Sequence, residues 1–231
     1  MPPHRSSCRK LPCLRRIRYY RPAYGQPHGT HTAGSRRPAH RLRQGTGRAG
    51  RPPSADSIHG ASTGSSTKPV ITAVHGRCFT AGLELALNSE ICIAAGDTVF
   101  GQQEVTRGIV ALGGATVRLP HRAGWGNAMR HLLTGDQIDA QEAWRMGIVQ
   151  EVVPAGHELD RALELAHRIA AQARLAVQAT PADARSALAP HIAASAAGLR
   201  NDVGPRLFAT ADAAEGIASL IERRVPTYEG I

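Results

Sequence analysis

The chain has 231 residues, of which 42% are hydrophobic and 20% charged, and its formal net charge is +10. Residues 1–60 hold 13 of the 28 Lys and Arg residues and a single acid, Asp56, which leaves 15 basic and 17 acidic residues in the rest. The length therefore suits one domain with extensions, and the charge does not mark the main part of the chain as a nucleic-acid binder. No apolar run approaches the 18 or so residues of a membrane span.

The cysteine pattern argues against a metal site and against a disulfide framework. The four cysteines form no C-x-x-C pair and no Cys/His cluster at zinc spacing: Cys8, Cys13, Cys78 and Cys92. The first residues also lack the 7–15-residue apolar core of a secretory signal. We expect a cytoplasmic protein with reduced thiols, and the excess of arginine over lysine favours a bacterial source with GC-rich DNA.

Residues 1–66 differ in composition from the rest of the chain. They contain eight of the fifteen prolines, with Arg, His, Ser and Gly between them, and show neither helical nor strand periodicity. Such a segment is predicted to be disordered, because it cannot bury enough surface to offset its ordering entropy. Four interpretations stay open: a nucleic-acid-binding tail, an organelle-targeting segment, a plain extension, and a shifted reading frame or misassigned start.

Residues 67–231 are predicted to form one domain, with a core over 67–155 and a helical part over 156–231. Strands are expected over 70–74, 91–95 and 98–100, a helix over 83–88, and Glu104 on a loop. A helix is expected from about 126, a strand over 149–153, a helix over 159–170, and broken helix over 173–199. Strands followed by helices indicate an α/β fold.

Two further helices show terminal signals. For the first, Asp139 is predicted as the N-cap, Glu142 completes a capping box, and Gly147 stands where a left-handed residue ends a helix. For the last helix, Asp212 and Glu215 are predicted to form a second capping box.

The stretch from Val74 to Glu104 carries the candidate chemistry. The small-residue turn before Glu84, including Ala81 and Gly82, leads directly into a helix, so unpaired backbone N–H groups face outward at its positive end. Together with Glu84 and Glu104, such donors suit proton transfer beside a carbonyl group. Spacing alone favours the structural alternative, in which Glu84 is a helix-start residue and Glu104 a solvated loop acid.

A resemblance to a known family favours the catalytic interpretation of the two glutamates. The chain resembles the crotonase, or enoyl-CoA hydratase/isomerase, family over residues 68–231. The matching motifs are Val74-His75-Gly76, Thr80-Ala81-Gly82-Leu83-Glu84-Leu85-Ala86, Phe100-Gly101-Gln102-Gln103-Glu104, Gly113-Gly114-Ala115-Thr116, Arg118-Leu119-Pro120, Leu133-Thr134-Gly135 and Val152-Val153-Pro154.

The resemblance implies a crotonase-like spiral of ββα units and hydration of 2-enoyl-CoA to 3-hydroxyacyl-CoA, as in fatty acid β-oxidation. It places the acid/base pair on Glu84 and Glu104 and one oxyanion donor on Ala81, with Gly82, Leu112 and Gly113 lining the acyl site. It does not fix which glutamate activates water. It implies no cofactor beyond the coenzyme A of the substrate, and a homotrimer or homohexamer. The charge distribution and the lack of a long apolar run lead us to expect neither a nucleic-acid nor a membrane partner.

Two departures from the family pattern leave alternatives open. Thr80-Ala81-Gly82 replaces the usual three glycines, and residues 1–66 contain no recognisable version of the segment that supplies early strands and the other oxyanion donor. A catalytically weak assembly or binding protein, or a family isomerase or thioester hydrolase, therefore stands beside the hydratase.

Overall fold

The computed structural model describes residues 17–20 and 68–230, and the strands of these residues form two small sheets. In one sheet the order is β1-β2-β4-β7, and in the other it is β3-β5-β6. The strands are β1 (Ile17–Tyr20), β2 (Ile71–Val74), β3 (Arg77–Phe79), β4 (Ile91–Ala95), β5 (Val99–Gly101), β6 (Ile138–Asp139) and β7 (Glu151–Val153).

From β2 to β5 the chain alternates between the two sheets. β2 and β4 are parallel in the first sheet, and β3 and β5 are parallel in the second. Gly76, with φ of 62°, makes the turn that carries the chain from β2 to β3. Helix α2 (Ala81–Leu87) then returns the chain to β4. This ββα repeat is the crotonase-like α/β arrangement that the resemblance implied.

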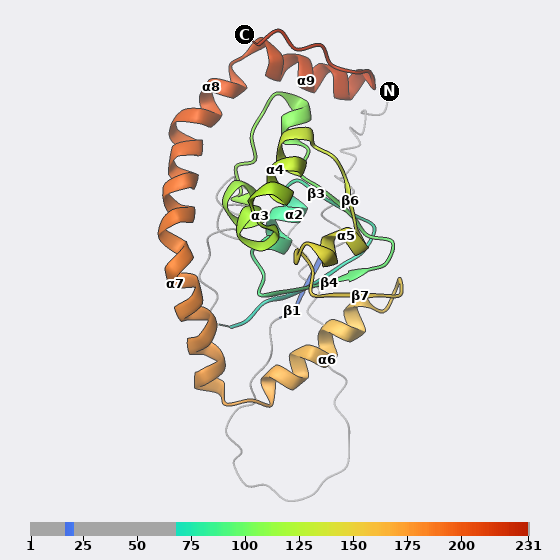
Figure 1. Ribbon diagram of the computed structural model, residues 1–231, viewed down its shortest axis with the longest axis vertical. Coiled ribbons are helices and arrows are strands. Elements are labelled where there is room, and N and C mark those ends of the chain that lie inside the picture. The colour runs from blue at the N-terminus through green and yellow to red at the C-terminus, as the bar shows by residue number, and fades with distance from the viewer. Residues whose placement is uncertain (1–16, 21–67, 231) are drawn as a thin grey trace, which may run out of the picture.

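Helices make up most of the remaining chain (Figure 1). The other helices are the 3₁₀ helix η2 (Glu104–Arg107), α3 (Ala115–Ala123), α4 (Trp125–Thr134), α5 (Ala140–Arg145), α6 (Glu158–Ala170), α7 (Arg174–Gly198), the π-helix η3 (Leu199–Val203), α8 (Gly204–Phe208) and α9 (Ala211–Glu222). Figure 1 shows α7 running along one side of the molecule from α6 to α8 and α9. In the described part of the chain, no helix is long and apolar enough to span a membrane.

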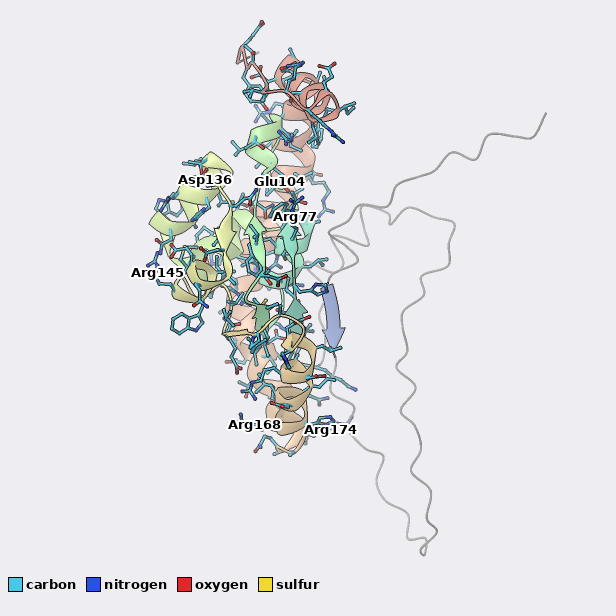
Figure 2. The ribbon with its side chains drawn as sticks, turned by 90° about the vertical axis from the view of Figure 1, so that its right-hand side faces the viewer. Arg77, Glu104, Asp136, Arg145, Arg168 and Arg174 are labelled. Carbon is cyan, nitrogen blue, oxygen red and sulfur yellow. The ribbon has the colours of Figure 1, made fainter. Side chains whose placement is uncertain are left out.

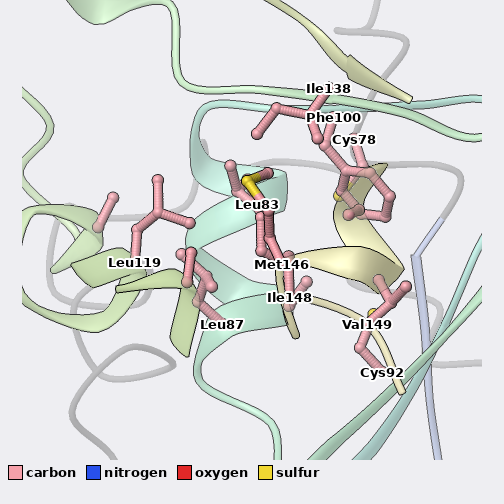
Figure 3. Packing of buried hydrophobic residues seen from close by; sticks show 14 of the residues in the cluster. Cys78, Leu83, Leu87, Cys92, Phe100, Leu119, Ile138, Met146, Ile148 and Val149 are labelled. Atoms are coloured by element: carbon pink, nitrogen blue, oxygen red, sulfur yellow. The ribbon is translucent and has the colours of Figure 1, made fainter. Parts of the chain in front are cut away.

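The hydrophobic core surrounds α2 (Figure 3). Leu83 and Leu87 of α2 are buried against Leu119 of α3 and Ile148, and full burial of each such side chain contributes about 1.5–3 kcal/mol. The buried thiols of Cys78 and Cys92 act as small apolar groups. Because α2 is packed on all these sides, the polar residue it carries at position 84 is held in a fixed place.

The structure corrects several predicted helix ends. Asp139 is the N-cap of α5, as predicted, and accepts a hydrogen bond from Glu142 N at 2.8 Å. The side chain of Glu142, however, pairs with Arg145 and so does not close the capping box. The second predicted box is wrong, because Thr210 caps α9 and accepts a hydrogen bond from Ala213 N.

Other elements also differ from the prediction. Helix α3 was not predicted, and α7 is continuous although it contains Pro181 and Pro190. Within the N-terminal segment, β1 pairs antiparallel with β2, with Ile17 opposite Val74, where no strand was expected. The other interpretations of residues 1–66 fall on residues outside the described ones.

Candidate active site

Parallel pairing of β3 and β5 brings the two glutamates together. Phe79 at the end of β3 lies opposite Gly101 at the end of β5, and Thr80 N donates a hydrogen bond to Gly101 O at 2.8 Å. Glu84 follows β3 on α2, and Glu104 follows β5 on η2. Because the carboxyl ends of parallel strands meet at one edge of a sheet, residues 20 positions apart share one site.

The turn before α2 has an unusual backbone at Thr80. Its φ of 51° and ψ of −120° are rarely adopted by a β-branched residue, and such a conformation costs on the order of 1–3 kcal/mol. Of the residues in the Thr80-Ala81-Gly82 turn, Thr80 is therefore the one whose backbone would favour glycine, whereas Ala81 begins the helix.

Glu84 is a buried carboxylate held by backbone donors. Its side chain is 5% exposed, and its Oε1 accepts hydrogen bonds from Gly113 N at 2.7 Å and from Ala115 N at 3.2 Å. A Cβ atom on Gly113 would overlap the Glu84 carboxylate, so this approach requires glycine. Hydrogen bonds from N–H groups stabilise the ionised form of a carboxylate.

Arg118 lies beside this carboxylate. It is 6% exposed, and its Nη1 donates a hydrogen bond to Gly113 O at 3.0 Å. Burial lowers the pKa of Arg118, whereas the charge of Glu84 raises it. The Arg118 guanidinium and the Glu84 carboxylate thus both bind the Gly113 turn, and each offsets the buried charge of the other.

Glu104 has a different environment from Glu84. Burial, with a further contribution from the charge of Glu84, raises the pKa of Glu104 to about 7. Its Oε2 is buried and has no hydrogen-bond partner among the described residues, and the same holds for both polar atoms of the Gln102 side chain. Gln102 opposes the rise in the pKa of Glu104 weakly, through proximity rather than through a well-formed hydrogen bond.

The position of Glu104 depends on the C-terminal helix. Figure 2 shows Glu104 on the side of the α/β body that faces the C-terminal helices. A Cβ atom on Gly216 of α9 would overlap the backbone of Arg107, and one on Gly108 would lie 2.7 Å from the backbone of Asp212. These glycine contacts allow α9 to pack directly on η2, so the last helix fixes the turn that carries Glu104.

The remaining predicted site residues lie around the glutamates. Ala81 and Gly82 form the first turn of α2, where backbone N–H groups lack helical partners. Gly113 uses its N–H for Glu84 rather than for a substrate oxygen. The partly buried side chain of Leu112 faces Gly204 at the start of α8.

Sequence reasoning does not identify two buried residues beside the glutamates as parts of the site. These residues are Arg118 and Gln102, which occur in the sequence only within the family motifs. The available signal was a charged or amide side chain beside buried apolar positions. No group of three or more possible metal ligands occurs in the part of the chain that the structure describes.

This geometry agrees with the comparisons with known proteins. The enoyl-CoA hydratase/isomerase family matches residues 59–230, so the match begins nine residues before Lys68. The chain belongs to this family, which is also called the crotonase family. Enzymes of the crotonase family act on acyl-CoA thioesters.

Individual relatives carry related names. The chain is 36% identical over 163 residues to the 2,3-dehydroadipyl-CoA hydratase of Escherichia coli. This match covers 71% of this chain and 64% of that relative. It is 39% identical over 161 residues to the crotonyl-CoA hydratase of Syntrophomonas wolfei, and this match covers 70% of this chain and 62% of that relative. The crystal structure of a carnitinyl-CoA hydratase from Mycobacterium avium gives a TM-score of 0.69 at 34% identity, covering 74% of this chain and 67% of that one. The chain thus spans less than two thirds of the length of these two hydratases from E. coli and S. wolfei.

Proposed function

We propose that the protein is an enoyl-CoA hydratase, which adds water across the 2,3 double bond of a 2-enoyl-CoA to give a 3-hydroxyacyl-CoA. The observation that carries the proposal is the pair of buried carboxylates in unlike environments. Glu84 accepts two backbone hydrogen bonds that favour its ionised form, whereas the pKa of Glu104 is raised to about 7. One carboxylate is therefore suited to accept a proton and the other to donate one.

This difference assigns the two roles. Glu84, as the ionised group, accepts a proton from water while the water oxygen bonds to carbon 3. Glu104, as the protonated group, gives its proton to carbon 2, and the electron pair of the double bond forms the new C–H bond. The unpaired Oε2 of Glu104 and the amide of Gln102 are available to orient the water and the substrate. The product then carries a neutral 3-hydroxyl group, Glu84 holds the proton taken from water, and Glu104 is ionised. A net transfer of one proton from Glu84 to Glu104 restores both glutamates.

The thioester carbonyl requires stabilisation as negative charge moves onto its oxygen. We assign one donor to the N–H of Ala81, at the start of α2 and on the same side of the sheet as both glutamates. The strained backbone of Thr80 orients this N–H, because Thr80 is held by its hydrogen bond to Gly101 O. Loss of one such donor typically lowers the rate about 10²- to 10³-fold.

Assembly into a homotrimer or homohexamer belongs to the same proposal. Ile217, Leu220 and Ile221 lie at helical spacing on α9 and are exposed in the single chain. Burying this stripe against a second copy would also hold α9 against η2 and thus Glu104 in place. Light scattering on the purified chain tests this part of the proposal.

Product analysis separates hydration from the other reactions of the family. Purified protein is incubated with a short 2-enoyl-CoA, and the products are separated by chromatography. Appearance of 3-hydroxyacyl-CoA supports the proposal. A 3-enoyl-CoA product would indicate an isomerase, free coenzyme A would indicate a thioester hydrolase, and unchanged substrate from folded protein would indicate a binding or assembly role.

A further inference from the structure

Arg118 is the one buried cation in contact with the Gly113 turn that holds Glu84, among the residues described. Its guanidinium folds back from the first turn of α3 and donates to Gly113 O at 3.0 Å. A Cβ atom on Gly114 would overlap this guanidinium, so glycine at this position leaves the space that the guanidinium occupies. The side chain is 6% exposed and therefore has been removed from solvent almost completely.

The location of this cation is unfavourable unless an anion accompanies it. A helix N-terminus carries a partial positive charge, and a cation in the first turn is normally disfavoured there. Glu84 supplies the compensating charge, since it attracts Arg118 and accepts hydrogen bonds from Gly113 N and Ala115 N. The backbone donors, the helix terminus and the guanidinium thus converge on one carboxylate.

We infer that Arg118 is a positioning residue that keeps Glu84 ionised and aimed at the reacting water by holding the Gly113 turn in place. This inference deepens the proposed function, on which its kinetic part rests. Arg118 touches neither water nor substrate in this role. It acts through the Gly113 carbonyl and through its charge, so that Glu84 can accept a proton while Glu104 keeps one.

Two other charged groups, Glu104 and Arg122, also act on Glu84 and Arg118. Glu104 on η2 repels Glu84, and Arg122 lies one turn further along α3 and repels Arg118. Arg122 is partly buried, and it donates hydrogen bonds to Ser89 O, just after α2, and to Ile148 O. Arg122 is therefore the control: a partly buried arginine of the same helix that does not hold the Gly113 turn.

The kinetic test compares the pH dependence of kcat/KM for hydration in Arg118→Met, Arg118→Lys and Arg122→Met. Arg118→Met lowers kcat/KM at least tenfold and moves the acid limb about one unit to higher pH, because Glu84 loses the charge that favours its ionised form. Arg118→Lys keeps the charge and leaves the acid limb in place, with a lower kcat. Arg122→Met changes stability but leaves the acid limb unmoved. An unshifted acid limb in Arg118→Met would overturn the inference.

A second measurement does not depend on activity. Denaturant unfolding is measured for Glu84→Gln, Arg118→Met and the double variant. Each single variant leaves one buried charge uncompensated, so the double variant is expected to be more stable than the two losses predict together, by about tenfold or more in the unfolding equilibrium constant. Coupling in a protein without hydratase activity would refute the proposed reaction while retaining the Glu84–Arg118 relation. Additive effects within about twofold would overturn that relation itself.

Discussion

The charge of Glu84 raises the pKa of Glu104, although the two carboxylates come from separate elements, α2 and η2. Burial is the larger cause and the neighbouring charge the second. The relation follows from the parallel pairing of β3 and β5, which places both glutamates at one edge of a sheet. It places the two carboxylates in unlike environments at one site, which is the arrangement that the proposed acid/base pair requires.

The first prediction concerns the pH dependence of the reaction. Since the pKa of Glu104 is about 7 and hydration requires its protonated form, kcat/KM is expected to fall as pH rises above about 7. Hydration takes up no net proton, so dehydration of the product must show the same limb. In Glu84→Gln the pKa of Glu104 is expected to decrease, which carbon-13 NMR of the carboxyl group measures directly. An unchanged titration would show that the two carboxylates do not interact.

Stability should also depend on the protonation of Glu104. Its pKa is raised from 4.5 to about 7 on folding, so the folded state binds the proton more tightly. The contribution of Glu104 to the free energy of unfolding is therefore at its full value below pH 4.5. It is lost as the pH rises through 7, and the free energy of unfolding falls by about 3 kcal/mol in total. Glu104→Gln is expected to abolish most of this dependence in urea unfolding at pH 5 and 8, whereas Asp97→Asn, at an exposed turn, leaves it intact.

The strained backbone at Thr80 predicts a stabilising substitution. Thr80→Gly removes the conflict between a Cβ atom and a φ of 51°, while glycine adds some entropy to the unfolded chain. The net gain is expected to be about 1 kcal/mol in the free energy of unfolding. Thr80→Ser retains the Cβ atom and serves as the control. If both variants had equal stability, strain at this position would be ruled out.

Glu84 should be sensitive to the size of residue 113. In Gly113→Ala the new methyl group overlaps the Glu84 carboxylate, and relief by movement costs about 1–3 kcal/mol of stability. Displacement of the carboxylate is also expected to lower kcat at least tenfold, roughly as for a 1 Å misplacement of a reacting group. Gly126→Ala on α4 meets no atom within 4 Å and should leave kcat unchanged. Equal activity of the two variants would argue against this position for Glu84.

Sequence reasoning succeeded where the relevant signal is local. The Asp139 cap depends on a residue three positions away, and the structure confirms it. The capping box failed because Arg145 offers Glu142 a stronger, charged partner. The hydrogen bond from Gly113 to Glu84 joins residues 29 positions apart, and the contact of Gly216 with η2 spans still more. Such contacts are set by the packing of distant segments, which no local pattern encodes.

The candidate site also combines features that the sequence indicates with features that only the folded chain shows. The resemblance indicated Glu84 and Glu104 as a pair, but the separate roles that we propose for them rest on burial and hydrogen bonding, which only the folded chain displays. Arg118 was visible as a motif residue, yet its relation to Glu84 depends on its guanidinium folding back over the start of α3.

The central claim is tested most directly by the loss of the conjugated-thioester absorbance of a short 2-enoyl-CoA. The purified 231-residue chain is compared with Glu84→Gln and Glu104→Gln, after circular dichroism has shown that all three are folded. The account predicts turnover by the wild-type chain and a loss of about 10²-fold or more in each variant. Turnover that survives both substitutions would contradict the assignment of this glutamate pair as the acid/base machinery.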